Sequence, residues 1–378
     1  MSWPVTGMGA VAATGAGVQE LFDNLCAGRS GVGELRGFDR SRYSGRHAYE
    51  IDNRETPGAD VPGRATALLV DAIGQAVHDA GLDGDLTGIP VLVGTGLREL
   101  RSVELRHRDG AAFPAEELHF GTALRRAFGA DDTHTISNAC SASLYALAMG
   151  ADLLELGTAD TVVVAGVDVL TESMYGLLER VQPVPPERVR PFDRNRAGAL
   201  MGEGAAAVVL SRDALPARRV HGLVRGVSVN CDAYHVTAPD PAGIAEAIRD
   251  AHERVGVKPK DIDLVMVHGT GTLLNDEAEA TALTEVFGAE VGRPLMTAVK
   301  SMTGHTSGAS GLLNLVIALR CLAEGRTPPT PGLDDPVEEA AAFRFVVGEE
   351  SRQPVSVAQL DAFGFGGINA VAIVEAAR

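Results

Sequence analysis

Residues 133–157, THTISNACSASLYALAMGADLLELG, contain a change from strand to helix. The stretch opens with β-branched residues, which favour an extended strand, and turns at 137–139. Beyond the turn, Gly157 is placed to end a helix. Cys140 is therefore expected at a strand-to-helix turn, near the helix start. The apolar residues that recur there at roughly helical spacing are Leu144, Leu147, Ala148, Ala151, Leu154 and Leu156.

The expected position of Cys140 has a chemical consequence. Free N–H groups and the positive end of the helix dipole stabilise a thiolate and lower the pKa of the thiol. This favours a nucleophile that forms acyl thioesters, labelled by iodoacetamide ahead of Cys26, Cys231 and Cys321. The alternative is a small buried cysteine with a packing role. The position alone supports both interpretations equally.

Composition and charge limit the possible functions. The chain has 378 residues, 45% of them hydrophobic, which supports a large core. The net charge of −17 gives no support to nucleic-acid binding, and docking of an acidic carrier protein would need a local basic patch. The four cysteines are dispersed, which predicts neither a metal site nor disulfides. Without a signal peptide or a long apolar run, we expect a cytoplasmic protein that does not enter membranes.

Strands and helices alternate along the chain, which predicts an α/β fold. The polar, proline-containing segment 211–219 is the expected joint between an N-terminal half, 1–212, and a C-terminal half, 213–378. The expected helices are 18–28, 65–81, 140–157, 244–255, 276–287 and 311–323, and the expected strands lie near 4, 91–93, 133–136, 160–169, 205–210, 264–267, 343–347 and 370–374.

Two similar segments indicate an internal duplication. VLVGTG at 91–96 and VMVHGTG at 265–271 each predict a strand that runs into a Gly-Thr-Gly turn. Each is followed along the chain by a turn of small residues that opens an apolar helix, at Cys140 in the first half and at 301–311 in the second. Together these repeats predict two related α/β halves whose helix-opening turns face each other.

The duplication places His268 and His305 opposite Cys140. Both lie in Gly/Thr turns, where open α/β proteins build their sites, although a single histidine is more often an ordinary packed residue. Two neutral imidazoles can donate N–H groups to one oxyanion, such as an enolate after decarboxylation. Lys300 is expected to orient the histidines electrostatically. Asp276 and Glu279 are spaced for pairing with backbone or lysine and need not be catalytic.

The chain resembles the elongating β-ketoacyl synthases of the thiolase superfamily. The resemblance is carried by motifs that run in family order from near one end to near the other. These are VTGMGAVAATG, VGTG, SNACSASL, PFDRNRAGALMGEGAAAVVL, CDAYHVTAPDPAG, VHGTGTLLNDEAEATAL, AVKSMTGHTSGASG and FGFGGINA. The resemblance implies the five-layer αβαβα thiolase fold, usually dimeric.

The resemblance also implies roles for individual residues. Cys140 would accept an acyl group, and His268 and His305 would assist decarboxylation of a malonyl-type thioester, with Lys300 supporting His305. The backbone N–H groups of Cys140 and Phe365 would form an oxyanion hole. Phe365 matches the family's gatekeeper to the acyl pocket. The implied substrate-binding residues are Thr270 and Thr272 on the pantetheine arm, with Phe363, Gly364 and Gly366 of the FGFGG loop.

The implied partners are an acyl carrier protein and acyl and malonyl thioesters. The implied assembly is a homodimer or a heterodimer with a ketosynthase-like subunit. No metal and no cofactor are expected, since phosphopantetheine of the carrier protein or of coenzyme A carries the substrates.

The sequence departs from the family pattern at three places. Asn314 stands where the family usually has a glutamate that pairs with Lys300, and Ala197 stands where aspartate is common. The segment 41–63 lacks the basic cluster that often docks carrier proteins. These departures favour polyketide or related specialised biosynthesis over ordinary fatty-acid elongation. The alternative is a non-elongating acyltransferase or a chain-length-factor-like partner subunit; because Cys140 and both histidines are present, the active enzyme is favoured.

Overall fold

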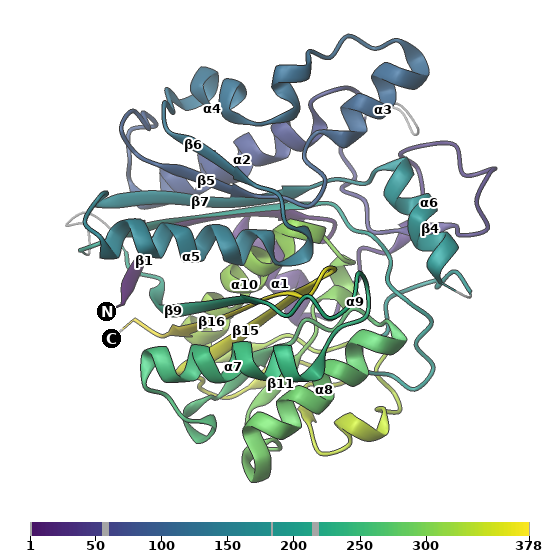
Figure 1. The fold of residues 1–378 in the computed structure, drawn as a ribbon, viewed down its shortest axis with the longest axis vertical. Coiled ribbons are helices and arrows are strands. Elements are labelled where there is room, and N and C mark those ends of the chain that lie inside the picture. Colours follow the sequence, from purple (N-terminus) through teal and green to yellow (C-terminus); the bar gives the residue numbers. More distant parts are fainter. Residues whose placement is uncertain (1, 55–59, 183, 214–218, 378) are drawn as a thin grey trace.

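Two β-sheets lie one above the other, with helices between them and on both outer faces (Figure 1). The computed structural model describes residues 2–54, 60–182, 184–213 and 219–377. The first sheet has the order β1-β8-β7-β5-β6 and the second the order β13-β11-β10-β15-β16-β9, and a short antiparallel pairing of β9 with β1 joins them. The first sheet consists of β1 Trp3–Ala12, β5 Val91–Gly94, β6 Thr133–Ile136, β7 Thr161–Asp168 and β8 Gly204–Ser211. The second consists of β9 Gly222–Cys231, β10 Leu264–Met266, β11 Leu295–Thr297, β13 Arg344–Phe345, β15 Val357–Gly364 and β16 Ile368–Glu375.

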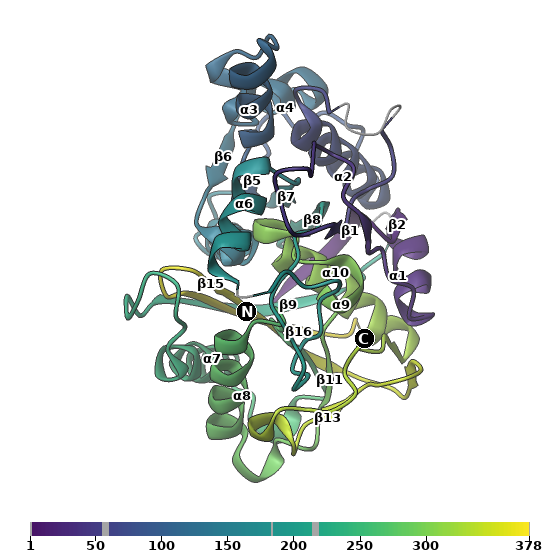
Figure 2. The ribbon, with the colours of Figure 1, turned by 90° about the vertical axis from the view of Figure 1, so that its right-hand side faces the viewer.

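The helices complete five layers. Helix α2 (Arg64–Ala80) covers the outer face of the first sheet, while α5 (Ala142–Glu155) and α10 (Ser310–Glu324) pack between the sheets. Helices α7 (Pro241–Val255) and α8 (Leu273–Phe287) cover the outer face of the second sheet. This arrangement confirms the predicted αβαβα fold. The remaining helices are α1 Val18–Cys26, α3 Leu100–Asp109, α4 Gly121–Phe128, α6 Glu172–Val181 and α9 Lys300–Thr303. Figure 2 shows α3 and α4 at one end of the molecule and α8 towards the other.

Small residues let the central helices approach the sheets. The inner strands β7 and β8 are almost entirely buried, because helices cover both faces of their sheet. A Cβ on Gly94 of β5 would lie 2.4 Å from the backbone of Ala142 and Ser143. Glycine at 94 therefore allows the start of α5, and with it Cys140, to sit directly against the end of β5.

Two equivalent turns open the central helices. Ala139 has φ 59° and begins the 3₁₀ turn Ala139–Ser141 before α5, while Ser307 has φ 47° and begins the 3₁₀ turn Ser307–Ala309 before α10. Positive φ is costly for a residue with a side chain. The two turns pack against each other, so the helix-opening turns of the two halves face one another as the repeats predict.

Most predicted elements are present with small shifts of their ends, and two predictions need correction. The helix predicted from 276 begins at Leu273, capped by Thr272. The long apolar run judged absent from the sequence exists, because Ser307–Glu324 is long and apolar enough to span a membrane by length and composition. It is a core helix, since 89% of that window is buried. Part of the predicted joint, 214–218, lies outside the described residues.

Candidate active site

The side chain of Cys140 meets that of His305 where the two central helices begin. The Cys140 Sγ lies 2.9 Å from His305 Nε2. The neighbouring Ser141 Oγ donates a hydrogen bond to the carbonyl oxygen of Ile368 at 3.0 Å, which ties the cysteine turn to β16. Nucleophile and imidazole thus come from the facing turns of the two halves.

The pKa of the Cys140 thiol is raised, contrary to the sequence-based expectation of a lowered pKa. Burial raises the pKa of Cys140 to about 11, against the opposing influence of the Lys300 charge and of the N–H groups of Phe365 and Cys140 itself. The cost of removing a thiolate from water exceeds what the helix start contributes. Because His305 Nε2 lies within hydrogen-bond reach, it is placed to take the proton when the thiol attacks.

Both histidines are neutral near pH 7. Burial, followed by the Lys300 charge, holds the pKa of His268 and of His305 well below the usual 6.5. Their rings lie 5.5 Å apart between centroids at 86° to each other. Two neutral imidazoles at this separation can both donate N–H to one oxygen atom between them.

Lys300 contacts His268 rather than His305. Its Nζ donates to the His268 carbonyl oxygen at 2.5 Å and lies 3.4 Å from His268 Nδ1. An ammonium beside Nδ1 makes that nitrogen the acceptor and leaves the proton on Nε2. The support expected for His305 is therefore limited to the effect of the Lys300 charge on its pKa. Burial lowers the pKa of Lys300 itself to about 8.

The turn between β15 and β16 lies against the cysteine. A Cβ on Gly364 would lie 3.3 Å from the backbone nitrogen of Cys140. Phe365 is 46% exposed, and its backbone N–H opposes the rise that burial causes in the pKa of the Cys140 thiol. Gly366 N donates to Val236 O at 2.8 Å. The loop that carries Phe365 thus lies beside Cys140, and the oxyanion hole formed by the N–H groups of Cys140 and Phe365 stays a prediction.

The other predicted substrate-binding residues are buried or half-buried, whereas Phe365 is exposed. Phe363 is buried, with its ring 5.7 Å from that of His268, so in this conformation it packs under the histidine. Thr272 Oγ1 accepts the N–H of Asn275 as the cap of α8 and lies 2.9 Å from Thr270 Oγ1. Contact of these residues with the pantetheine arm stays a prediction.

Asp168, at the end of β7, is a site residue that the sequence analysis missed. It is fully buried, and burial raises its pKa to about 6. Its oxygens link the turn after β5 to the turn before α10, and so fix the two walls of the site. The donors are Thr95 Oγ1 at 2.8 Å, Gly96 N at 2.7 Å, Leu97 N at 2.8 Å and Gly308 N at 2.7 Å. The signal in the sequence is an acid that closes an apolar strand, VVVAGVD.

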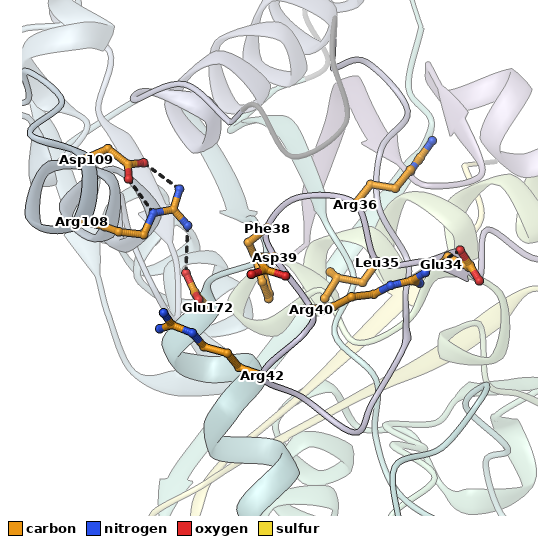
Figure 3. A pocket seen from close by; sticks show the side chains of 10 residues that line it. All are labelled: Glu34, Leu35, Arg36, Phe38, Asp39, Arg40, Arg42, Arg108, Asp109 and Glu172. Carbon is orange, nitrogen blue, oxygen red and sulfur yellow. Dashed lines mark hydrogen bonds and ion pairs between the residues drawn. The ribbon is translucent and has the colours of Figure 1, made fainter.

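An open surface cavity of about 740 Å³ lies apart from these groups (Figure 3). Its charged groups balance, four arginines against four acids, and Arg108 pairs with Asp109 and Glu172. It therefore does not supply the net basic patch that an acidic partner would need. Its lining consists of Glu34, Leu35, Arg36, Phe38, Asp39, Arg40, Arg42, Arg108, Asp109 and Glu172. Among the described residues, no group of three metal-ligating side chains is present.

The chain matches known families and proteins along almost its whole length. Family models described as "Beta-ketoacyl synthase, N-terminal domain" and "Beta-ketoacyl synthase, C-terminal domain" match residues 4–215 and 221–334. The chain is 30% identical to 3-oxoacyl-[acyl-carrier-protein] synthase 2 of Synechocystis, covering 97% of this chain and 95% of that protein. It is 31% identical to the tetracenomycin polyketide synthase ketoacyl synthase alpha subunit of Streptomyces glaucescens, covering 98% and 96%.

The structural comparison covers the whole chain. The solved ishigamide ketosynthase/chain length factor superposes with a TM-score of 0.90 and 31% identity, covering 100% of this chain and 99% of the other. Matching sequence motifs, family models covering both halves and one shared fold all lead to the same assignment. The chain belongs to the β-ketoacyl synthase family, the condensing acyltransferases of the thiolase superfamily.

Proposed function

We propose that Cys140 carries the acyl group in this ketosynthase. The observation that carries the assignment is the 2.9 Å contact of Cys140 Sγ with a neutral His305, with His268 facing the same point. In acyl transfer, His305 takes the thiol proton as sulfur attacks the incoming thioester. The carrier's thiol leaves with a proton, and the acyl group stays on Cys140. The N–H groups of Cys140 and Phe365 stabilise the tetrahedral oxyanion.

We further propose that the two histidines serve the condensation step. The bond from the malonyl carbon to its carboxylate breaks, carbon dioxide leaves, and the electron pair forms a thioester enolate. N–H groups of His268 and His305 hold the enolate oxygen. The enolate carbon then attacks the acyl carbonyl, the bond to Cys140 Sγ breaks, and the 3-ketoacyl product remains on the extender's carrier. Lys300 holds His268 in the N–H donating tautomer.

The pathway, partners and location are inferred from the relatives. One relative is a polyketide synthase alpha subunit, another acts with an acyl carrier protein by name, and a solved neighbour combines a ketosynthase with a chain length factor. We propose that this chain extends acyl carrier protein substrates in polyketide or related specialised biosynthesis, as a homodimer or a heterodimer. Cytoplasmic location and the absence of a cofactor beyond the substrate's phosphopantetheine stay predictions.

Mass spectrometry of the intact protein and of its peptides tests the proposal. Incubation with acyl thioesters is expected to add one acyl group on Cys140, and addition of a malonyl thioester is expected to release carbon dioxide and remove the acyl group. Cys140→Ser should not accumulate the acyl thioester, whereas Cys231→Ser, at an exposed cysteine, should behave as wild type. Acylation elsewhere, or none with any thioester, would favour the partner-subunit alternative.

A further inference from the structure

The imidazole of His305 has a contact at only one of its two nitrogens. Its Nε2 lies 2.9 Å from Cys140 Sγ, whereas its Nδ1 is buried and has no hydrogen-bond partner among the described residues. A catalytic base is commonly oriented by a third group that bonds to its second nitrogen. Because the described chain supplies no such group, the distance from this imidazole to the sulfur depends on how the backbone at His305 is held.

The main chain of His305 pairs with the segment 200–203. His305 N donates to Leu200 O at 2.8 Å, and Gly202 N donates to His305 O at 3.0 Å. The two chains lie so close together that a Cβ on Gly202 would be 2.1 Å from the carbonyl oxygen of Thr303. The position of this segment therefore determines the position of His305.

Tyr49 holds the same segment from its other side. It directly follows the short strand β4 (His47–Ala48) and is fully buried. Its N–H donates to Met201 O at 3.0 Å, and its carbonyl oxygen accepts Glu203 N at 2.9 Å. These pairings and those of His305 are parallel, so the chains around 49, 201 and 305 lie side by side.

The side chain of Tyr49 reaches the helix that leads from Lys300 to His305. Helix α9 has only four residues, so its last carbonyl groups have no partner within the helix. The hydroxyl of Tyr49 donates to one of them, Ser301 O, at 3.2 Å and accepts Val189 N at 3.1 Å. Through this hydrogen bond Tyr49 holds the residue that follows Lys300.

The ring of Tyr49 lies against Gly304, the residue before His305. A Cβ on Gly304 would lie 2.5 Å from Tyr49 Cδ2, so glycine leaves room for the ring there. Gly304 also has φ 68° and ψ −176°, a backbone conformation that is essentially restricted to glycine. Main chain, hydroxyl and ring of Tyr49 thus contact three different parts of the backbone that holds His305.

We propose that Tyr49 is a positioning residue for His305. It fixes the turn from Lys300 to His305 and so sets the distance from His305 Nε2 to Cys140 Sγ. It acts through His305 rather than on the substrate. The inference rests on the proposed role of His305 as the proton acceptor in acyl transfer, and it names a residue outside the two helix-opening turns on which that role depends.

The test uses alkylation of Cys140 by iodoacetamide, which reports on the His305–Cys140 pair without any acyl substrate. Tyr49→Phe keeps the ring and removes the hydroxyl, which leaves Ser30 Oγ, at 3.5 Å, as the described side-chain donor to Ser301 O. We expect labelling at pH 7–8 to slow about tenfold. The deficit should shrink as the pH rises, because the thiolate then forms without His305. Self-acylation should slow by a similar factor at saturating acyl thioester, with the half-saturating concentration unchanged.

A double-mutant cycle separates positioning of His305 from general damage to the fold. If Tyr49 acts through His305, Tyr49→Phe should slow labelling by less than about twofold once His305 is replaced by alanine. The matched control is Tyr175→Phe, which removes another buried hydroxyl, whose hydrogen bond is to His47 O at 3.4 Å. This control should change labelling by less than about twofold in either background.

An unchanged labelling rate in folded Tyr49→Phe, or equal slowing in the wild-type and His305→Ala backgrounds, overturns the assignment. If Tyr49→Phe does not fold, Tyr49→Gln replaces it under the same two criteria, because an amide can pair with both backbone groups while the ring is lost. A wild-type protein that is labelled with the help of His305 and Tyr49 but is never acylated on Cys140 would contradict the proposed function and leave this inference standing. Normal acylation of Cys140 that is insensitive to Tyr49 would contradict the inference alone.

Discussion

At residue 140, we expect reactivity to depend on His305, because burial raises the pKa of the thiol. With a thiol pKa of about 11, only a small fraction is thiolate at pH 8, so a proton acceptor must assist each attack. His305 Nε2, which lies 2.9 Å from Cys140 Sγ, is the acceptor that we propose. We expect His305→Ala to slow iodoacetamide labelling of Cys140 at pH 7–8 by about tenfold or more. The difference should close as the pH rises towards the thiol pKa, where the thiolate forms unaided.

Peptide mass spectrometry measures this labelling residue by residue. Cys231 is exposed and serves as the internal standard, and labelling of Cys140 ahead of it stays a prediction. Cys26 and Cys321 are buried, burial raises the pKa of both thiols, and both should stay unlabelled. His107→Ala, at an exposed histidine of α3, is the matched control. An unchanged rate for Cys140 in His305→Ala across the pH range would remove the histidine from the acylation step.

At the scale of single residues, motif spacing predicted that Cys140, His268 and His305 lie close together, because each lies in a turn whose local sequence is distinctive. It could not give the protonation state of Cys140, since the local helix start and the burial act in opposite directions and burial depends on the whole fold. The same limit hid Asp168. It is an acid at the end of an apolar strand, and only tertiary contacts reveal which groups surround it.

We expect the β15–β16 turn to place the Phe365 N–H beside the Cys140 sulfur, and the glycines of the turn permit its positive φ angles. Gly367 has φ 75°, and a Cβ there would lie 2.0 Å from Asp232 Oδ1. Gly367→Ala must therefore displace the turn and move the Phe365 donor. We expect self-acylation to slow by about 10²-fold, the effect of losing one oxyanion donor. The measurement is the rate of acyl addition by intact-protein mass spectrometry.

Gly348→Ala is a close control for this element. Gly348 has nearly the same φ, 74°, and a Cβ there would meet nothing within 4 Å. An alanine at either position bears the strain of a left-handed backbone, about 1–2 kcal/mol. This strain should therefore lower the urea midpoint of both variants by a similar amount. Only Gly367→Ala should lose acylation. Equal acylation rates in the two variants would show that the position of the turn does not limit the reaction.

Elements with clear periodicity were predicted closely, whereas two central strands were not. Helix α2 was expected at 65–81 and spans Arg64–Ala80, because its apolar face repeats at helical spacing. Strands β9 and β15 were not predicted. β9 includes Arg225, Ser228 and Asn230, and β15 includes Gln359 and Asp361. These polar side chains find partners in neighbouring elements, so tertiary contacts stabilise strands that hydrophobic patterning does not reveal.

The whole molecule shows why the site lies between the halves. Each central helix starts at a strained turn, and the two turns pack face to face, so neither half alone contains both the nucleophile and the histidines. Asp168 binds turns from both sides of this boundary. The repeats in the sequence were enough to predict that the turns meet. They did not predict the hydrogen bonds that hold the turns together, since these depend on one side chain outside the repeats.

The first sheet ends at β6, which leaves an unpaired edge on the molecule. Val91 N donates to Asp132 O and Thr95 N donates to Ile136 O, each at 2.9 Å. Because main-chain groups alternate in direction along a strand, Thr133 and Thr135 direct theirs away from β5. Within the described chain β6 pairs only with β5. Such an edge readily accepts a strand from a second chain, and we expect the dimer to form there.

Thr135→Pro tests this assembly, because proline removes an outward N–H and spares the pairing with β5. Light scattering after gel filtration should find wild type as a dimer of the 39.4 kDa chain and Thr135→Pro as a monomer with an unchanged circular dichroism spectrum. His134→Pro is the contrasting variant, since it removes a group directed at β5 and should lower the urea midpoint of the fold itself. A Thr135→Pro protein that stays dimeric at the same concentration would place the subunit contact on another surface. A monomeric wild type would instead require a different ketosynthase-like chain at this edge.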